Sequence, residues 1–451
     1  MRKITNRAFS LLLIAALVIG GMGLYLLEYI DRGESWAKYF SRVNSGSSGV
    51  LLDRNGQVLA AFGKGVENFS QDAAARVANY HVTGDYWGRT GAGILSRYWS
   101  GMQDFSLFTG MTKTENSTLP LSIDTRLNQV MYKALLAQDP EAKGMMMLCN
   151  YKTGEMLGLV SVPSVDPLDE NTPPRDGAYI NRCLSASFTP GSIFKLITAA
   201  AAYEQIPDID QRTFYCDHEY DIAGVTITCT GTHYEQTFEQ ALSNSCNCAF
   251  AQIAVMLGQD TMVDYVTRYG FLDKQELSGI STVAGSYPTE FVGDPELAWS
   301  SIGQSTDMVC PYAMLRFLCA VANGGELVEP SLILLAEPAK ASPYMEPATA
   351  QRLRQMMNFN VVDHYNGEEN FPGLRLCAKT GTAELGNGSS HAWFVGFLAD
   401  EKHPYAFVTL VERGGYGLST AGPITNEVLQ WAVENIEPTL SIQGETRFPA
   451  A

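Results

Sequence analysis

The pattern of apolar and polar positions divides the chain into an apolar segment, a polar stretch and a long region of mixed strands and helices. Residues 8–27 contain no charged residue, and a helix of this length spans a hydrocarbon core about 30 Å thick. Basic residues precede it and acidic residues follow it, so the positive-inside rule places the N-terminus in the cytoplasm. The pattern predicts a cytoplasmic tail over residues 1–7 and a single-pass transmembrane anchor over residues 8–28.

A cleaved secretory signal is the alternative for this segment. Such signals usually contain an apolar region of about 7–15 residues and an A-x-A-like cleavage site, and neither feature fits well here. Both interpretations place the chain after Gly33 outside the membrane, and no second stretch of similar length and apolarity follows. We therefore expect a protein of the cell membrane whose main domain is extracytoplasmic.

Residues 29–118 are expected to form a tether and a small N-terminal domain. The polar, Ser- and Gly-rich stretch 34–49 is typical of a tether. Two apolar runs flank Asn55-Gly56, a pair that accepts positive φ at both positions of a tight turn, so we predict a β-hairpin there. Residues 71–115 are rich in Gly and aromatic residues and fit no single element.

From Leu119 onward, helices and strands alternate irregularly, which predicts an α+β domain over residues 119–440 and a C-terminal tail over residues 441–451. No internal repeat is visible. The expected elements include a strand over 119–124, a helix over 125–138, a hairpin turning at 152–154, strands over 392–399 and 405–412, and a helix over 423–436.

Composition narrows the class of protein without defining its chemistry. Apolar residues make up 46% and charged residues 18%, which excludes wholesale disorder. The net charge of −17 would repel a phosphate backbone, so no nucleic-acid partner is expected. The 9 cysteines are too few for a disulfide-stapled mini-domain, and their odd number leaves at least one thiol unpaired.

Ser192 and Lys195 form the first candidate motif. A Pro-Gly turn precedes Ser192 and an Ala-rich helix former follows Lys195, so the serine is expected at a helix N-terminus, where free N–H groups favour negative charge. Lys195 would lie one turn away among apolar neighbours, which lower a lysine pKa and provide a neutral amine as base. The alternative for Ser192 is a helix cap, the commoner role of a serine at this position. Ser35 and Lys38 have the same spacing but lie in the predicted tether.

Ser245 and Asn247 form the second motif, the only S-x-N in the chain, between two helical patterns. A hydroxyl and an amide two positions apart on a loop can face one cleft, where the hydroxyl passes protons and the amide orients a substrate amide. On its own, the pair would more often be a turn or a helix cap.

The third motif, Lys379-Thr380-Gly381-Thr382, ends an apolar run. A strand edge that carries a cation and hydroxyls can bind a substrate carboxylate, and Gly381 leaves room for the close approach of another backbone. Residues 152–154 have the same first three letters, but they occupy a predicted hairpin turn.

In this order, S-x-x-K, S-x-N and K-T-G resemble the signature set of penicillin-binding proteins and serine β-lactamases. The segments PGSIFKLITAAAA, ALSNSCNCAF, SSIGQS, VANGG and AKTGTAE followed by HAWFVGF resemble the transpeptidase domain of class B penicillin-binding proteins. Upstream, GVLLDRNGQVLA and YHVTGDYWGRTG are similar to the short, penicillin-binding protein A type. The resemblance covers most of residues 48–430. It implies the penicillin-binding transpeptidase (β-lactamase-like) fold with a small non-catalytic N-terminal domain, and no glycosyltransferase domain fits before residue 119.

The resemblance also implies the role of each motif residue in acyl transfer. No metal takes part in this chemistry. The implied roles are Ser192 as acylated nucleophile, Lys195 as general base, Ser245 as proton relay, Asn247 as the contact to the substrate amide, and Lys379, Thr380, Gly381 and Thr382 as the carboxylate-binding strand, with the N–H groups of Ser192 and Thr382 as oxyanion hole.

The implied activity is a peptidoglycan D,D-transpeptidase. Ser192 would attack the D-Ala–D-Ala bond of a stem peptide, and an amine of a neighbouring strand would resolve the acyl-enzyme, whereas a β-lactam would stall it. If water resolved it instead, the protein would be a D,D-carboxypeptidase or β-lactamase, and a non-catalytic β-lactam sensor or cell-wall scaffold is the alternative outside enzymes. The implied partners are stem peptides, β-lactams, the membrane and a polytopic peptidoglycan glycosyltransferase.

Cys216 and Cys229 flank a predicted hairpin that turns at Gly224. Three interpretations stay open. An extracytoplasmic location suits a disulfide, His218 and His233 would complete a four-ligand zinc site, and free cysteines commonly pack as small hydrophobic residues.

Overall fold

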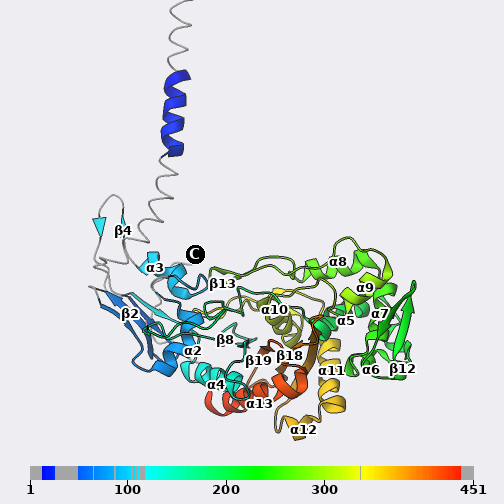
Figure 1. Cartoon of the computed structure of the whole chain (residues 1–451). Helices are drawn as coiled ribbons and strands as arrows, with labels where there is room; N and C mark the ends of the chain where they lie inside the picture. The colour runs from blue at the N-terminus through cyan, green and yellow to red at the C-terminus, as the bar shows by residue number, and fades with distance from the viewer. Residues whose placement is uncertain are drawn as a thin grey trace, which may run out of the picture. The chain divides into compact units, whose positions relative to one another are not determined.

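The computed structural model of the chain is shown in Figure 1. The chain divides into two compact units: one comprises Met1–Val50, Ala61–Asn68 and Tyr98–Ser117, and the other comprises Leu51–Ala60, Phe69–Arg97 and Thr118–Ala451. The domain boundaries that the sequence suggests stay predictions. The structure describes residues 13–25, 49–63, 66–85, 88–102, 105–106, 110–111, 117–169, 171–335 and 337–437.

The first unit contains a helix over residues 13–25 whose apolar side chains, Leu17 and Leu24 among them, are exposed. Within the described ranges, no helix combines the length and the apolar character that spanning a bilayer requires. The remaining residues of the predicted anchor lie outside the described residues, so the single-pass anchor stays a prediction. Two short strands of this unit, β4 (Phe105–Ser106) and β5 (Gly110–Met111), pair antiparallel.

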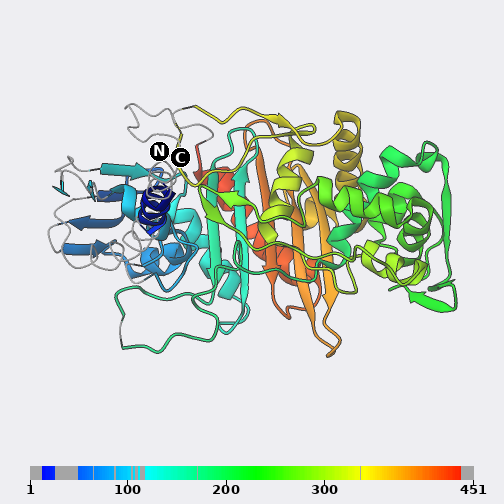
Figure 2. The ribbon, with the colours of Figure 1, turned by 90° about the horizontal axis from the view of Figure 1, so that it is seen from above.

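A five-stranded antiparallel sheet forms the centre of the second unit (Figure 2). Most of its residues are buried on both faces, which explains why these strands read as nearly continuous apolar runs. In spatial order the strands are β17 (Leu376–Glu384), β18 (Ser390–Leu398), β19 (Tyr405–Val411), β7 (Gly144–Asn150) and β8 (Met156–Val162), so β17 and β8 form the two edges.

Helices cover both faces of this sheet. On one face, α4 (Thr125–Leu136) and α13 (Gly417–Asn435) share a hydrophobic core with the strands. On the opposite face lies α10 (Pro311–Ala322), as Figure 1 shows. The edge strand β17 also contacts α11 (Pro347–His364). The strand that carries Lys379 is therefore held by β18 and by a helix.

A second group of elements, green in Figure 2, lies beyond the β17 edge of the sheet. Its helices are α5 (Lys195–Gln205), α6 (Phe238–Ser243), α7 (Asn247–Leu257), α8 (Gln259–Arg268) and α9 (Asp294–Ser301). The 3₁₀ helix η1 (Gly191–Phe194) precedes α5, and the 3₁₀ helix η2 (Ile209–Gln211) follows it. Its antiparallel strand pairs are β9 (Thr213–Cys216) with β12 (Tyr234–Thr237) and β10 (Glu219–Ile222) with β11 (Val225–Thr228).

The α+β class and most of the expected elements are confirmed, including the turn at residues 152–154, where Gly154 has a φ of +77°. In the described part of 71–115, which the sequence pattern left unassigned, the chain forms the helices α2 (Ala73–Thr83) and α3 (Ile94–Met102). The remaining elements are β1 (Gly49–Leu52), β2 (Val58–Gly63), β3 (Val66–Phe69), α2 (Ala73–Thr83), α3 (Ile94–Met102), β6 (Ser117–Pro120), β13 (Glu276–Leu277), β14 (Ile280–Ser281), β15 (Glu326–Leu327), β16 (Ser342–Pro343) and α12 (Gly367–Asn370).

The turn at Asn55-Gly56 forms, but with a different geometry from the one expected. Only Gly56 has positive φ, at +81°. Its N–H donates to the Asp53 carbonyl at 3.0 Å, and the Asp53 carboxylate accepts the Asn55 N–H at 2.9 Å. The carboxylate thus stabilises a four-residue turn over residues 53–56. The last residue of this turn is a single left-handed glycine, where a pair of left-handed residues was predicted.

Two element boundaries also differ from the prediction. The strand expected over residues 119–124 spans Ser117–Pro120, and the next residue, Leu121, forms an isolated bridge with Ile333. The closing helix α13 begins at Gly417, and Pro423, the expected start, lies inside it. A side chain at position 417 would overlap the Trp393 carbonyl, so this close contact with β18 fixes where the helix begins.

Candidate active site

Ser192 and Lys195 meet at the start of α5. Gly191 has a φ of +56°, which turns the chain into η1, and α5 follows from Lys195. Lys195 Nζ donates to Ser192 Oγ at 3.0 Å. The expected placement, with the serine at a helix N-terminus and the lysine one turn away, is therefore present.

The Lys195 ammonium group is fully buried and has several oxygen partners. Nζ donates to the Ser245 carbonyl at 2.6 Å and to Asn247 Oδ1 at 2.7 Å, and lies 3.4 Å from Ser245 Oγ. The Phe250 ring centroid lies 5.8 Å away. Burial lowers the pKa of Lys195 to about 8, although the nearby cysteines act in the opposite direction. A substantial fraction of this lysine is therefore neutral near physiological pH.

Ser245 occupies the short connection between α6 and α7, in a left-handed conformation with a φ of +52°. This conformation is unusual for a residue with a side chain and is strained. It aims both the carbonyl and the hydroxyl of Ser245 at Lys195. Asn247 begins α7, and its Nδ2 donates to the Thr228 carbonyl at 2.9 Å, which orients the amide oxygen toward Lys195.

Lys379 reaches the same hydroxyl from the edge strand β17. Its Nζ donates to Ser245 Oγ at 3.0 Å and to the Thr380 carbonyl at 3.0 Å. Lys379 is fully buried, and burial together with the charge of Lys195 holds its pKa well below the usual value of 10.5. The Ser245 hydroxyl thus lies between two amines and can pass a proton from one side of the site to the other.

Close backbone contacts hold η1 against β17. A Cβ atom added at Gly381 would lie 2.9 Å from Ile193 Cγ2 and 3.0 Å from the Pro190 carbonyl oxygen. A Cβ atom added at Gly191 would lie 2.7 Å from the Thr382 carbonyl oxygen. Only glycine at these positions permits the nucleophile turn to lie directly on the strand.

The two threonines of β17 differ in their surroundings. Thr382 is half-buried. The Thr380 hydroxyl lies 3.1 Å from the Tyr365 hydroxyl, which also accepts the Thr380 N–H at 3.0 Å. Tyr365, at the end of α11, thus fixes the middle of the K-T-G motif. Its role was not predictable, because nothing in the local sequence around Tyr365 links it to β17.

The alternative K-T-G copy at residues 152–154 is not at the site. Lys152 is exposed at the β7–β8 turn, where the Asn150 side chain accepts its backbone N–H at 3.0 Å. Ser35 and Lys38 lie outside the described residues.

A groove of about 890 Å³ opens beside the site. Thr189, just before the nucleophile turn, and Glu384, at the end of β17, both line it. Val225, Val292 and Trp299 add apolar surface. The groove is large enough for an extended peptide segment.

The family model described as the penicillin binding protein transpeptidase domain matches residues 144–430. The chain belongs to this family. The match covers the central sheet and all three motifs, and the expected class B, penicillin-binding protein A-like membership is confirmed by the relatives of the chain.

Curated relatives of this transpeptidase domain include Stage V sporulation protein D of Bacillus subtilis, 28% identical over 347 residues, which cover 69% of this chain and 53% of the relative. The peptidoglycan D,D-transpeptidase PbpA of Mycobacterium tuberculosis is 28% identical over 335 residues, covering 65% and 67% of the two chains. The chain thus spans about half the length of the sporulation protein.

Solved structures share the fold. Penicillin-binding protein A of M. tuberculosis, as a ceftriaxone acyl-enzyme complex, has a TM-score of 0.72 at 22% identity, covering 86% of this chain and 99% of that one. Pseudomonas aeruginosa PBP2 in complex with WCK 5153 has a TM-score of 0.72 at 22% identity, covering 87% and 97%. The predicted penicillin-binding transpeptidase fold is therefore confirmed.

The cysteines group differently from the expectation. Cys216 and Cys229 are free thiols, so the structure does not contain the disulfide. They lie together with Cys246 and Cys248, whereas His218 is exposed and lies outside this group. The spacing S-C-N-C in the second motif was the available signal for the other two cysteines.

Proposed function

We propose that this protein is a serine-type peptidoglycan D,D-transpeptidase that β-lactams acylate. The observation that carries the proposal is the 3.0 Å contact between the Ser192 hydroxyl and a buried lysine amine, with Ser245 linking that lysine to Lys379. The names of relatives such as PbpA and the acyl-enzyme complexes of structural neighbours support the same activity.

In the first step, neutral Lys195 accepts the Ser192 proton while Oγ forms a bond to the carbonyl carbon of the penultimate D-alanine. The N–H groups of Ser192 and Thr382 stabilise the oxyanion, a contribution of roughly 3–4 kcal/mol per donor in other acyl-transfer enzymes. The C–N bond then breaks, and the departing amine of D-alanine takes a proton through the Ser245 hydroxyl.

In the second step, an amine of a neighbouring stem peptide attacks the acyl-enzyme. Its proton returns through the same groups, the ester bond breaks and Ser192 recovers its hydrogen.

Lys379 supplies the positive charge that attracts the terminal carboxylate of the donor, and Asn247 orients the donor amide. The adjacent groove receives the donor peptide. A β-lactam follows only the first step, because its tethered leaving group stays in the site.

We also propose that residues 8–28 anchor the protein in the cell membrane, with residues 1–7 cytoplasmic and the active site outside. The uncharged run and the basic residues before it support this orientation. The stem-peptide substrate is found outside the membrane, where a polytopic glycosyltransferase would supply the glycan strands.

Labelling with a fluorescent penicillin tests the proposal. Ser192→Ala should abolish covalent labelling, whereas Ser35→Ala, which alters the tether copy of the motif, should leave it unchanged. Equal labelling of the Ser192→Ala protein would refute the assignment of the nucleophile. Incubation of the wild-type protein with a pentapeptide and an amine acceptor should give the aminolysed product. Release of D-alanine with hydrolysed product alone would identify a carboxypeptidase, and labelling without turnover would identify a sensor.

A further inference from the structure

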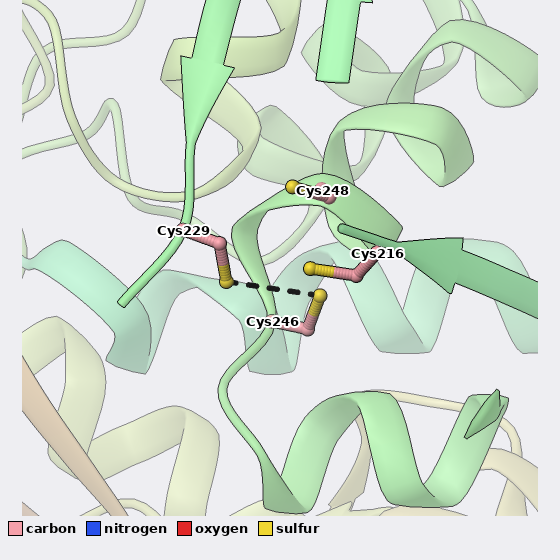
Figure 3. A group of neighbouring side chains, drawn as sticks. All are labelled: Cys216, Cys229, Cys246 and Cys248. Carbon is pink, nitrogen blue, oxygen red and sulfur yellow. Dashed lines mark hydrogen bonds between the residues drawn. The ribbon is translucent and has the colours of Figure 1, made fainter. Parts of the chain in front are cut away.

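Four buried cysteines converge behind the S-x-N loop, as Figure 3 shows. Their sulfur atoms all lie within 4.8 Å of one another. They come from three separate segments: Cys216 ends β9, Cys229 follows β11, and Cys246 and Cys248 lie at the start of α7. Nothing in the acyl-transfer mechanism uses them.

The spacing of the sulfur atoms matches a tetrahedral metal site. Four thiolates at about 2.3 Å from one zinc ion lie about 3.8 Å from each other. The Cys229 and Cys246 sulfur atoms are 3.9 Å apart. A disulfide would need about 2.05 Å, which this pair does not approach.

The surroundings of the sulfur atoms suit thiolates. The Asn247 N–H donates to Cys229 Sγ at 3.3 Å, and the Ala249 N–H donates to Cys246 Sγ at 3.4 Å. Both donors belong to the first turn of α7, whose dipole favours negative charge. His233 Nδ1 lies 3.7 Å from Cys229 Sγ and can donate a further hydrogen bond. Metal-bound ligands commonly receive such supporting hydrogen bonds.

We infer that Cys216, Cys229, Cys246 and Cys248 bind one zinc ion. Binding releases four thiol protons and leaves four thiolates around the metal, with no position open for water or substrate. A closed set of four sulfur ligands is typical of a structural zinc site. The site differs from the Cys216/His218/Cys229/His233 set that the sequence suggested, because α7 supplies two cysteines where histidines were expected.

The metal would fix the loop that carries Ser245 and Asn247. Two of its ligands flank Asn247 directly, and Cys246 follows the strained Ser245. The same ion ties this loop to the segment after β11, whose Thr228 carbonyl orients the Asn247 amide. Loss of zinc should therefore relax the loop and slow acylation of Ser192. The effect on acylation rests on the proposed function, whereas the binding of zinc does not depend on it.

Metal analysis of the full-length protein, purified without chelator, tests the site directly. We expect one zinc per chain, and we expect a mercurial thiol reagent to release that zinc as it modifies the cysteine ligands. Cobalt(II) in place of zinc should give the absorption bands of a tetrahedral thiolate site. These measurements on the wild-type protein need no variant to fold and do not depend on catalysis.

Matched variants locate the ligands. Cys248→Ser should weaken zinc affinity at least tenfold, whereas Cys319→Ala, a buried cysteine on α10, and His218→Ala should retain one zinc. Absence of zinc from the folded protein would overturn the inference. Iron in place of zinc, a disulfide within the group, or zinc loss in His218→Ala equal to that in Cys248→Ser would overturn it as well. Normal zinc content without penicillin labelling would refute the proposed function and leave the zinc site intact.

Discussion

The rate of Ser192 acylation should depend on pH through Lys195. Burial lowers the pKa of this lysine from 10.5 to about 8. About one-tenth of the amine is then neutral at pH 7 and about half at pH 8, whereas an unperturbed lysine would be neutral in only about 0.03% of molecules at pH 7. The site thus supplies roughly 300-fold more neutral base than an exposed lysine would. Acylation should rise about fivefold from pH 7 to 8 and level off above pH 9.

Second-order rate constants for a fluorescent penicillin, measured between pH 6 and 9.5, test this reasoning. Lys195→Arg retains a positive charge but cannot act as a base, so it should reduce the rate constant by roughly 10²- to 10⁴-fold at every pH. Thermal unfolding at each pH serves as the control for stability. A rate constant independent of pH between 6.5 and 8.5, or a wild-type rate in Lys195→Arg, would show that another group takes the serine proton.

Two further predictions concern the choice of motif and the stability of the fold. Lys379→Met should lower the acylation rate constant at least tenfold, because it removes the buried amine to which the proposed function assigns the substrate carboxylate. Lys152→Met, at the exposed turn, should change the rate constant less than twofold. The reverse order in the same labelling assay would show that residues 152–154 are the functional K-T-G motif. Burial lowers the pKa of His81, on α2, to about 4, and its Nε2 lies 3.0 Å from the Ala178 carbonyl oxygen. Because the unfolded chain binds this proton more readily, the stabilisation is present above about pH 6.5 and is lost as the pH falls toward 4, up to about 3 kcal/mol. Denaturant unfolding of His81→Gln should show a flatter pH dependence over this range, and an unchanged slope would exclude His81 as the cause.

The elements with a strong local signal were predictable from the sequence. The apolar runs of β18 and β19 predicted two strands of the central sheet, and the Ala-rich run after Lys195 predicted α5. The start of α13 was not predictable, because it depends on a contact between Gly417 and the backbone of Trp393, which lies far away in the sequence. Local patterns do not contain such tertiary contacts.

The candidate site, like the fold, was predictable only in part from the sequence. The three motifs identified the residues that meet around Ser245, but they gave no indication that Tyr365 would hold Thr380. The cysteine pair 216 and 229 was recognised through its hairpin. The other two cysteines of the group, which flank Asn247, join this pair only because α7 packs against β9 and β11, a tertiary contact that the local sequence does not contain.

The segment SSIGQS contributes to the site through its backbone. The Gly191 N–H donates to the Gly303 carbonyl at 2.9 Å, and a side chain at position 303 would overlap the Gly191 carbonyl. Gly303 has a φ of +76°, which a residue with a side chain would adopt only with strain. On its other side, Gly191 lies against the Thr382 carbonyl of β17. The nucleophile turn is thus held between a loop and an edge strand by two close backbone contacts. Its geometry is set before any substrate binds, which is the condition under which a hydroxyl and an amine 3.0 Å apart can transfer a proton efficiently.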